Sequence, residues 1–69
     1  MNIYRIKKDQ SIAALIDGAP EIVHMRQGQR IRGQYMRRDT INQTILISRG
    51  ADLWALPEGV IELVGSHNE

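Results

Sequence analysis

The side chains in this sequence that are best suited to chemistry are arginines, and six of them fall within residues 26–49. That stretch holds one acidic residue, Asp39, whereas residues 50–69 hold four acidic residues and no lysine or arginine. A guanidinium group presents a planar fork of five donors, which suits phosphate, carboxylate and base recognition. The basic middle of the chain therefore favours an anionic partner, and RNA or single-stranded nucleic acid is the partner we predict.

Alternation along a predicted strand places Arg30 and Arg32 on one face, together with Gln34 and Met36. Such a face could follow a phosphate backbone and contact bases. The candidate nucleic-acid-binding residues are Arg26, Arg30, Arg32, Gln34, Arg37, Arg38 and Arg49. The alternative is that the arginines pair with acidic side chains on a neighbouring strand.

A second functional interpretation is a regulatory module that binds another protein, such as a transcription or RNA-processing factor. The candidate partner-binding residues are Asp52, Trp54, Glu58 and Glu62. A lone tryptophan in a short strand can fill a core or anchor a partner, and the sequence leaves both roles open for Trp54.

No set of residues in the sequence predicts catalysis, a metal site or a cofactor. The chain has no cysteine and two histidines, which excludes thiol catalysis and cysteine–zinc sites. Neither His24 nor His67 has a serine or aspartate beside it at the spacing of a nucleophile and its base. We therefore predict that the protein is not an enzyme.

Length and composition predict one small domain over residues 1–69, of which 42% are hydrophobic. A chain this short buries only about 60% of its unfolded surface, and it has no disulfide to support the core, so we expect a homo-oligomer. The sequence has no apolar run long enough to span a bilayer and no apolar signal core near its start, so we expect a cytoplasmic protein without a membrane partner.

The expected fold is mostly β, with one short N-terminal helix. Asp9 or Ser11 could cap a helix over residues 11–17 that Gly18 and Pro20 end. Strands are expected at 21–26, 29–38, 41–48, 53–56 and 60–65, with residues 1–10 as an arm or extra strand and 66–69 as a frayed tail. Gly33 predicts a sharp bend in the second strand. We expect the five strands to close as a small barrel, which removes sheet edges.

Glycines, hydrophobic residues and an aspartate follow one another at a recognisable spacing in the middle of the chain. These residues are Gly28, Ile31, Gly33, Tyr35, Asp39 and Ile41. With them, residues 11–47 resemble the Sm-like family of small SH3-like barrels, of which Hfq-type RNA chaperones and Rof-type inhibitors of termination are members. The resemblance implies an N-terminal helix, a ring-forming barrel and RNA binding, or a Rof-like contact with a protein. Residues 54–59 replace the turn that contacts uridine in Hfq-type rings.

Overall fold

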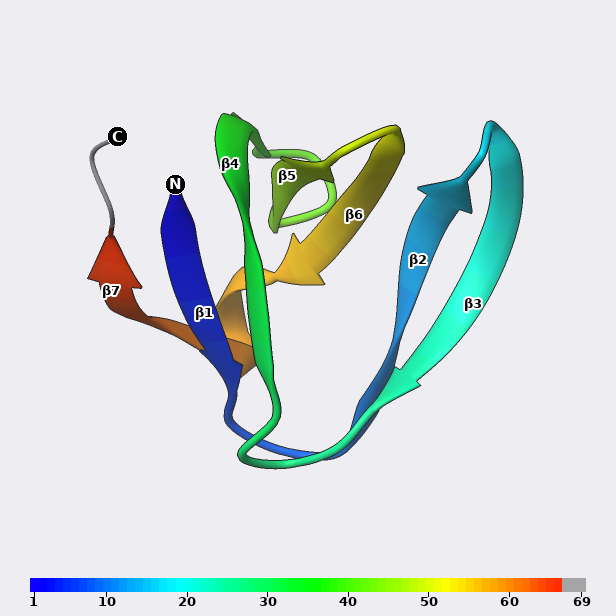
Figure 1. Cartoon of the computed structure of the whole chain (residues 1–69). Helices are drawn as coiled ribbons and strands as arrows, with labels where there is room; N and C mark the ends of the chain where they lie inside the picture. Colours follow the sequence, from blue (N-terminus) through cyan, green and yellow to red (C-terminus); the bar gives the residue numbers. More distant parts are fainter. Residues whose placement is uncertain (67–69) are drawn as a thin grey trace.

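The computed structural model describes residues 1–66, and it is built from seven antiparallel strands (Figure 1). The strands are β1 (Asn2–Ile6), β2 (Gln10–Ile16), β3 (Ala19–Met25), β4 (Arg30–Asp39), β5 (Thr44–Arg49), β6 (Asp52–Pro57) and β7 (Ile61–Ser66). A short 3-10 helix, η1 (Glu58–Val60), joins the last two strands. Ser66 ends β7, so the rest of the predicted frayed tail lies outside the described residues. Within residues 1–66, no helix has the length and apolar character needed to cross a membrane.

The strands form one open sheet in the order β3-β2-β6-β5-β4-β1-β7. The edge strands β3 and β7 lie on opposite sides of the molecule and do not pair with each other (Figure 1). The predicted closed barrel of five strands is therefore wrong. Two strands beyond the predicted five account for the difference: the N-terminal arm forms β1 between β4 and β7, and β2 forms in place of the predicted helix and pairs with β3 and β6.

The predicted helix over residues 11–17 is wrong because those residues form β2 and the turn that follows it. Asp17 and Gly18 have φ values of 51° and 81°, and Ile16 pairs with Ala19. Positive φ at both central residues defines a type I′ two-residue hairpin, for which Asp-Gly is a preferred sequence. A seven-residue helix would also be marginal in water, whereas the hairpin pairs β2 with neighbours on both sides.

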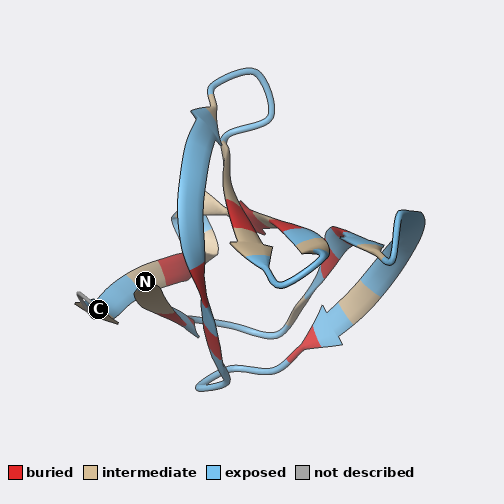
Figure 2. Cartoon of the chain, turned by 45° about the horizontal axis from the view of Figure 1, so that its top comes forward, coloured by how far each residue is buried: buried red, intermediate tan, exposed pale blue. Residues whose placement is uncertain are grey.

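The sheet curls around a core that its inner face supplies. Ten hydrophobic residues are buried, and every strand contributes at least one of them: Tyr4, Ile6, Ile12, Ala14, Met25, Ile31, Ile47, Trp54, Leu56 and Ile61. In Figure 2, buried segments alternate with exposed ones along the strands, and the turn after β4 is exposed. The sequence left open whether Trp54 fills the core or anchors a partner. Its side chain is 8% exposed and lies in the core.

Strand β4 links the two ends of the sheet because it changes partner along its length. Its first residues, up to Gly33, pair with β1, and the residues from Gln34 onward pair with β5. The register of β4 against β5 shifts between Tyr35 and Arg37, which is the position of a β-bulge. The bulge inserts one residue, so the side chains after it change face.

Candidate nucleic-acid interface

The structure places three of the predicted arginines in one row on the outer face of β4. Arg30 and Arg32 are exposed and alternate with buried Ile31, as the sequence predicts. Simple alternation would put Met36 on this face and Arg37 on the other, but the bulge pairs Arg37 with outward-facing Leu46. The outer face of β4 therefore carries Arg30, Arg32, Gln34 and Arg37, which we call the arginine row. At about 3.3 Å per residue, the row is roughly 20 Å long.

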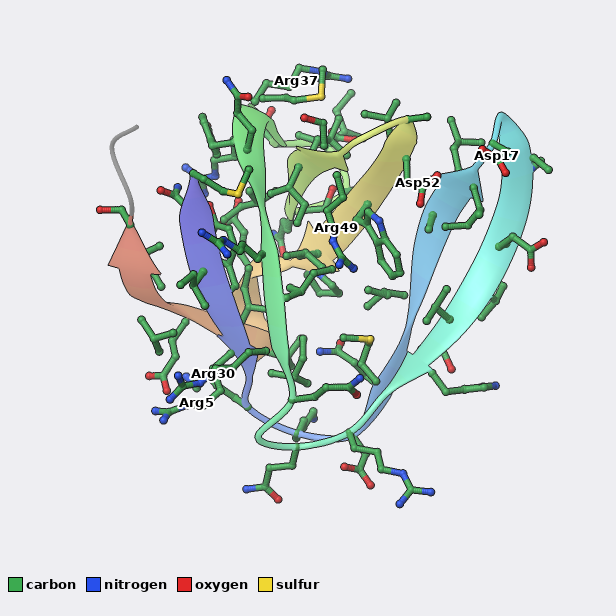
Figure 3. The ribbon with its side chains drawn as sticks, in the orientation of Figure 1. Arg5, Asp17, Arg30, Arg37, Arg49 and Asp52 are labelled. Carbon is green, nitrogen blue, oxygen red and sulfur yellow. The ribbon has the colours of Figure 1, made fainter. Side chains whose placement is uncertain are left out.

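Arg5 adds a fourth cation beside the arginine row, and sequence reasoning missed it. Arg5 on β1 is the direct cross-strand partner of Arg30, and Figure 3 shows the two side chains next to each other. Like charges directly opposite each other in a sheet are destabilising. Glu62 on β7 forms a salt bridge with Arg5 and offsets part of this repulsion. The juxtaposition of Arg5 and Arg30 depends on the pairing of β1 with β4, which residues 1–10 alone do not indicate.

The cations of the row differ in their partners. The salt bridges among residues 1–66 are Arg5–Glu62 and Arg38–Glu58, so Arg30 and Arg32 have no carboxylate partner in that part of the chain. Arg37 lies near Asp39 and contributes to lowering the pKa of that carboxyl, after the larger effect of hydrogen bonds from Asn42. The row thus keeps guanidinium donors available to an external anion.

The remaining predicted arginines lie away from the row. Arg26 follows β3, where its backbone N–H donates to Gln29 Oε1 at 3.0 Å. Arg38 follows Arg37 on β4, and its salt bridge with Glu58 raises its pKa above the ordinary value. Arg49 lies over the ring of Trp54, with its guanidinium carbon 5.8 Å from the ring centroid, which is within range of a cation–π interaction.

The predicted partner-binding residues are dispersed rather than gathered in one surface. Glu58 and Glu62 are engaged with arginines on different strands, and Trp54 is in the core. Asp52 Oδ1 accepts a hydrogen bond from the backbone N–H of Asp17 at 3.2 Å, which ties the β5–β6 turn to the β2–β3 turn (Figure 3). The prediction that basic and acidic segments pair their charges is thus true of Arg38 and Glu58, whereas Arg30 and Arg32 have no such partner within residues 1–66.

Arg32 and Arg49 come together at a hollow of about 540 Å³ near the start of the chain. Met1, Gly50 and Asp52 complete its lining. Two arginines and one aspartate leave this hollow with a net positive charge. Arg32 belongs to the arginine row, whereas Arg49 lies over the ring of Trp54.

A serine and a histidine that are 13 residues apart in the sequence, Ser11 and His24, also lie next to each other on the outer face. Ser11 on β2 is the cross-strand partner of His24 on β3, and Ser11 Oγ lies 2.7 Å from His24 Nδ1. Both residues are exposed. A nucleophile–base pair also needs a third group that orients the base. Among residues 1–66, no hydrogen bond joins a carboxylate to His24, and no group of three metal-binding side chains is present.

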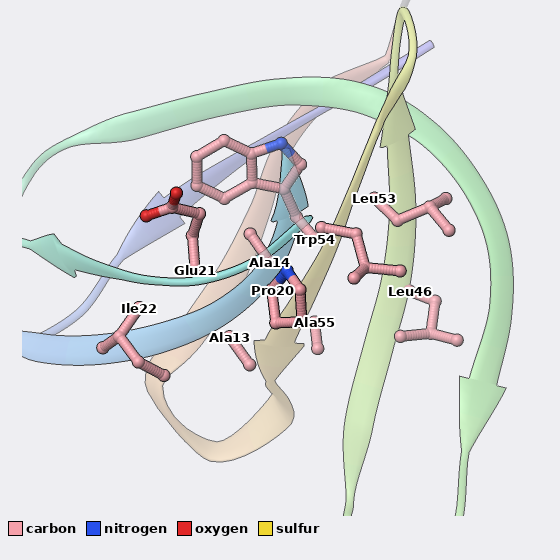
Figure 4. Close-up of a pocket in the computed structure, with 10 residues that line it drawn as sticks. Ala13, Ala14, Pro20, Glu21, Ile22, Leu46, Leu53, Trp54 and Ala55 are labelled. Carbon is pink, nitrogen blue, oxygen red and sulfur yellow. The ribbon is translucent and has the colours of Figure 1, made fainter. Parts of the chain in front are cut away.

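An apolar groove of about 410 Å³ lies across β3, β2, β6 and β5 (Figure 4). Its floor is formed where Ala13 pairs with Ala55, and Ile22 and Leu46 lie beyond them on the neighbouring strands. Figure 4 shows Trp54 and Glu21 on the inner side of these strands, opposite Ile22. Sequence reasoning missed this groove because it assigned β2 to a helix.

Comparison of the chain with protein-family models, curated proteins and solved structures gives no match. The Sm-like resemblance therefore stays a prediction. The site must be interpreted from its own residues.

Proposed function

We propose that the protein binds RNA or single-stranded nucleic acid through the arginine row. The observation that carries the proposal is that Arg30 and Arg32 have no carboxylate partner among residues 1–66 and lie beside a third guanidinium, that of Arg5. A row of cations that holds a like-charge pair is stabilised when an anion binds, because the anion offsets their mutual repulsion. A phosphate chain supplies such anions at regular intervals.

The length and chemistry of the row support a flexible single strand as the ligand. A row of roughly 20 Å on a curved strand offers several phosphate contacts, and Gln34 adds an amide that can donate to and accept from base edges. None of the four residues of the row is aromatic, and Tyr35, which is 48% exposed on β4, pairs with inward-facing Ile47 and so lies on the opposite face of the strand. We therefore expect affinity to come mainly from phosphates, with strong dependence on salt and weak dependence on base sequence.

A titration followed by NMR tests the location of binding. A single-stranded RNA oligonucleotide is added to ¹⁵N-labelled protein at about 50 mM salt, where electrostatic affinity is strong. We expect the amide shifts to change along β4 and β1, with smaller changes along β2 and β3. A single-stranded DNA oligonucleotide of the same sequence should give similar shifts if phosphates dominate.

Two results of this titration would contradict the proposal. One is the absence of shift changes at saturating RNA. The other is a set of changes confined to strands that lack the row. Either result would leave the protein-partner interpretation in its place.

A further inference from the structure

Strands β2, β5 and β6 are apolar on both faces of the sheet. In β2, Ile12 and Ala14 are buried on the inner face, while Leu15 on the outer face is 39% exposed. The edge strand β3 adds Ile22, which is 65% exposed on the same outer face. Near-continuous apolar runs are typical of strands that are covered on both sides. The outer side of this half of the sheet is exposed in the single chain.

The outer apolar residues form a knob beside a hole. Ala13 and Ala55 are small and adjacent, so they form the hole at the floor of the groove. Ile22 is the next residue across the strands, paired with Ala13, and it projects as the knob. A knob and a hole side by side on one surface can each meet the other on an identical surface turned by a two-fold rotation.

We propose that this apolar half of the sheet binds a second copy of the chain, face to face. A two-fold axis along β2 places Ile22 of each copy over Ala55 of the other, and Leu15 of each copy at the centre. The arginine row lies on β4, which is separated from β2 by β6 and β5. The row therefore stays outside the contact in both copies.

The apolar character of the groove favours a second copy over a charged partner, and the size of the groove predicts how strong the contact is. The outward-facing side chains of the groove carry no charge: they are Ala13, Leu15, Pro20, Ile22, Leu46, Leu53 and Ala55. Two identical copies can therefore meet without like charges in the contact, and a charged partner would find no counter-charge there. Three strands at about 4.8 Å spacing give a core contact roughly 14 Å wide. A contact this narrow buries less than the roughly 800 Å² that each partner of a standard interface buries, so we expect a weak dimer.

Sedimentation equilibrium of the full chain from about 5 µM to about 1 mM tests the proposal, together with thermal melting over the same range. We expect the parent to pass from monomer to dimer and its Tm to rise with concentration. Ile22→Glu should weaken the dimer more than tenfold and remove the concentration dependence of Tm. The matched control is Ile41→Glu in the turn after β4, where the side chain is 90% exposed; it should dimerise like the parent.

A parent that remains monomeric at the highest concentration would overturn the proposal and leave a foreign protein as the occupant of the groove. So would a dimer that Ile22→Glu leaves intact, or one that both variants weaken equally. Circular dichroism of Ile22→Glu shows whether the variant is folded. The experiment contains no nucleic acid, so its outcome is independent of the proposed function.

Discussion

Asp39 fixes the turn that ends β4, next to the last arginine of the row. Its Oδ1 accepts hydrogen bonds from the backbone N–H groups of Ile41 at 3.0 Å and Asn42 at 3.3 Å. The side-chain amide of Asn42 donates to Oδ2 at 2.8 Å. The bond from the Asn42 side chain lowers the pKa of Asp39 most, followed by the backbone bond from the same residue. The charged form of Asp39 is therefore the one that the folded turn favours.

This arrangement predicts a pH-dependent effect of Asp39→Ala. Because folding lowers the pKa of Asp39, its stabilisation is present above the unfolded value of about 3.9 and is lost as pH falls through the folded value. At neutral pH, Asp39→Ala should lower Tm relative to the parent. The difference in Tm should narrow as the pH falls below about 4. Melting curves at several pH values measure this, and a difference that stays constant down to the folded pKa would contradict the role of the charge.

At the scale of elements, Gly33 permits the close approach of β4 to β5. A Cβ atom at this position would lie 2.8 Å from Ile47 Cδ1 and 2.9 Å from the backbone oxygen of Ser48. The isoleucine methyl group could rotate away, but the Ser48 oxygen belongs to the paired strand. The glycine is thus explained by contact with β5 at the point where β4 changes partner, rather than by the corner of a closed barrel.

We expect Gly33→Ala to destabilise the fold by about 1 to 3 kcal/mol, because overpacking forces the two strands apart. Gly59→Ala is the matched control, since a Cβ at Gly59 meets nothing within 4 Å. Chemical denaturation of both variants measures the free energy of unfolding. If Gly33→Ala were as stable as the parent, β4 and β5 would not be close enough for a Cβ at position 33 to be crowded, and the packing explanation of Gly33 would be wrong.

The strands after residue 20 could be located from the sequence to within a few residues, because turn residues separate short apolar runs there. The hairpin of β2 and β3 could not, because Ile12, Leu15 and Ile16 also fit the spacing of a helical face. The signal that decides is Asp17-Gly18 between two apolar runs, which indicates a type I′ hairpin. The sequence also could not predict whether the sheet closes, because closure depends on whether the two edge strands pair with each other.

The site was predictable where it depends on one strand and was missed where it depends on pairing. Alternation alone put Arg30 and Arg32 on one face. The position of Arg37 needed the bulge, and the contribution of Arg5 needed the register of β1 against β4. The pairing of Glu62 with Arg5, 57 residues away in sequence, is likewise a property of the sheet.

At the scale of the whole molecule, the outer face of one continuous sheet divides into two halves of different chemistry. Strands β3, β2, β6 and β5 present the apolar groove, and β4 and β1 present the arginine row with Arg5. Leu46 and Arg37 are cross-strand partners at the boundary. In the proposed dimer, the apolar halves face each other and two arginine rows flank the contact, so one assembly could bind two segments of a single strand.

If the arginine row contacts phosphates, as we propose, RNA binding should weaken with salt in proportion to the number of these contacts. Fluorescence anisotropy with a labelled single-stranded RNA is measured at several salt concentrations for the parent and for the double variant Arg30→Ala/Arg32→Ala. The matched control is Lys8→Ala/Arg38→Ala, which removes two positive charges from outside the row. Each phosphate contact contributes about 0.7 to the slope of log affinity against log salt. We predict that the row variant flattens the slope by roughly 1.4, with little change in Tm, and that the control retains the slope of the parent. A slope that is unchanged in the row variant, or a parent that does not bind RNA at about 50 mM salt, would contradict the account.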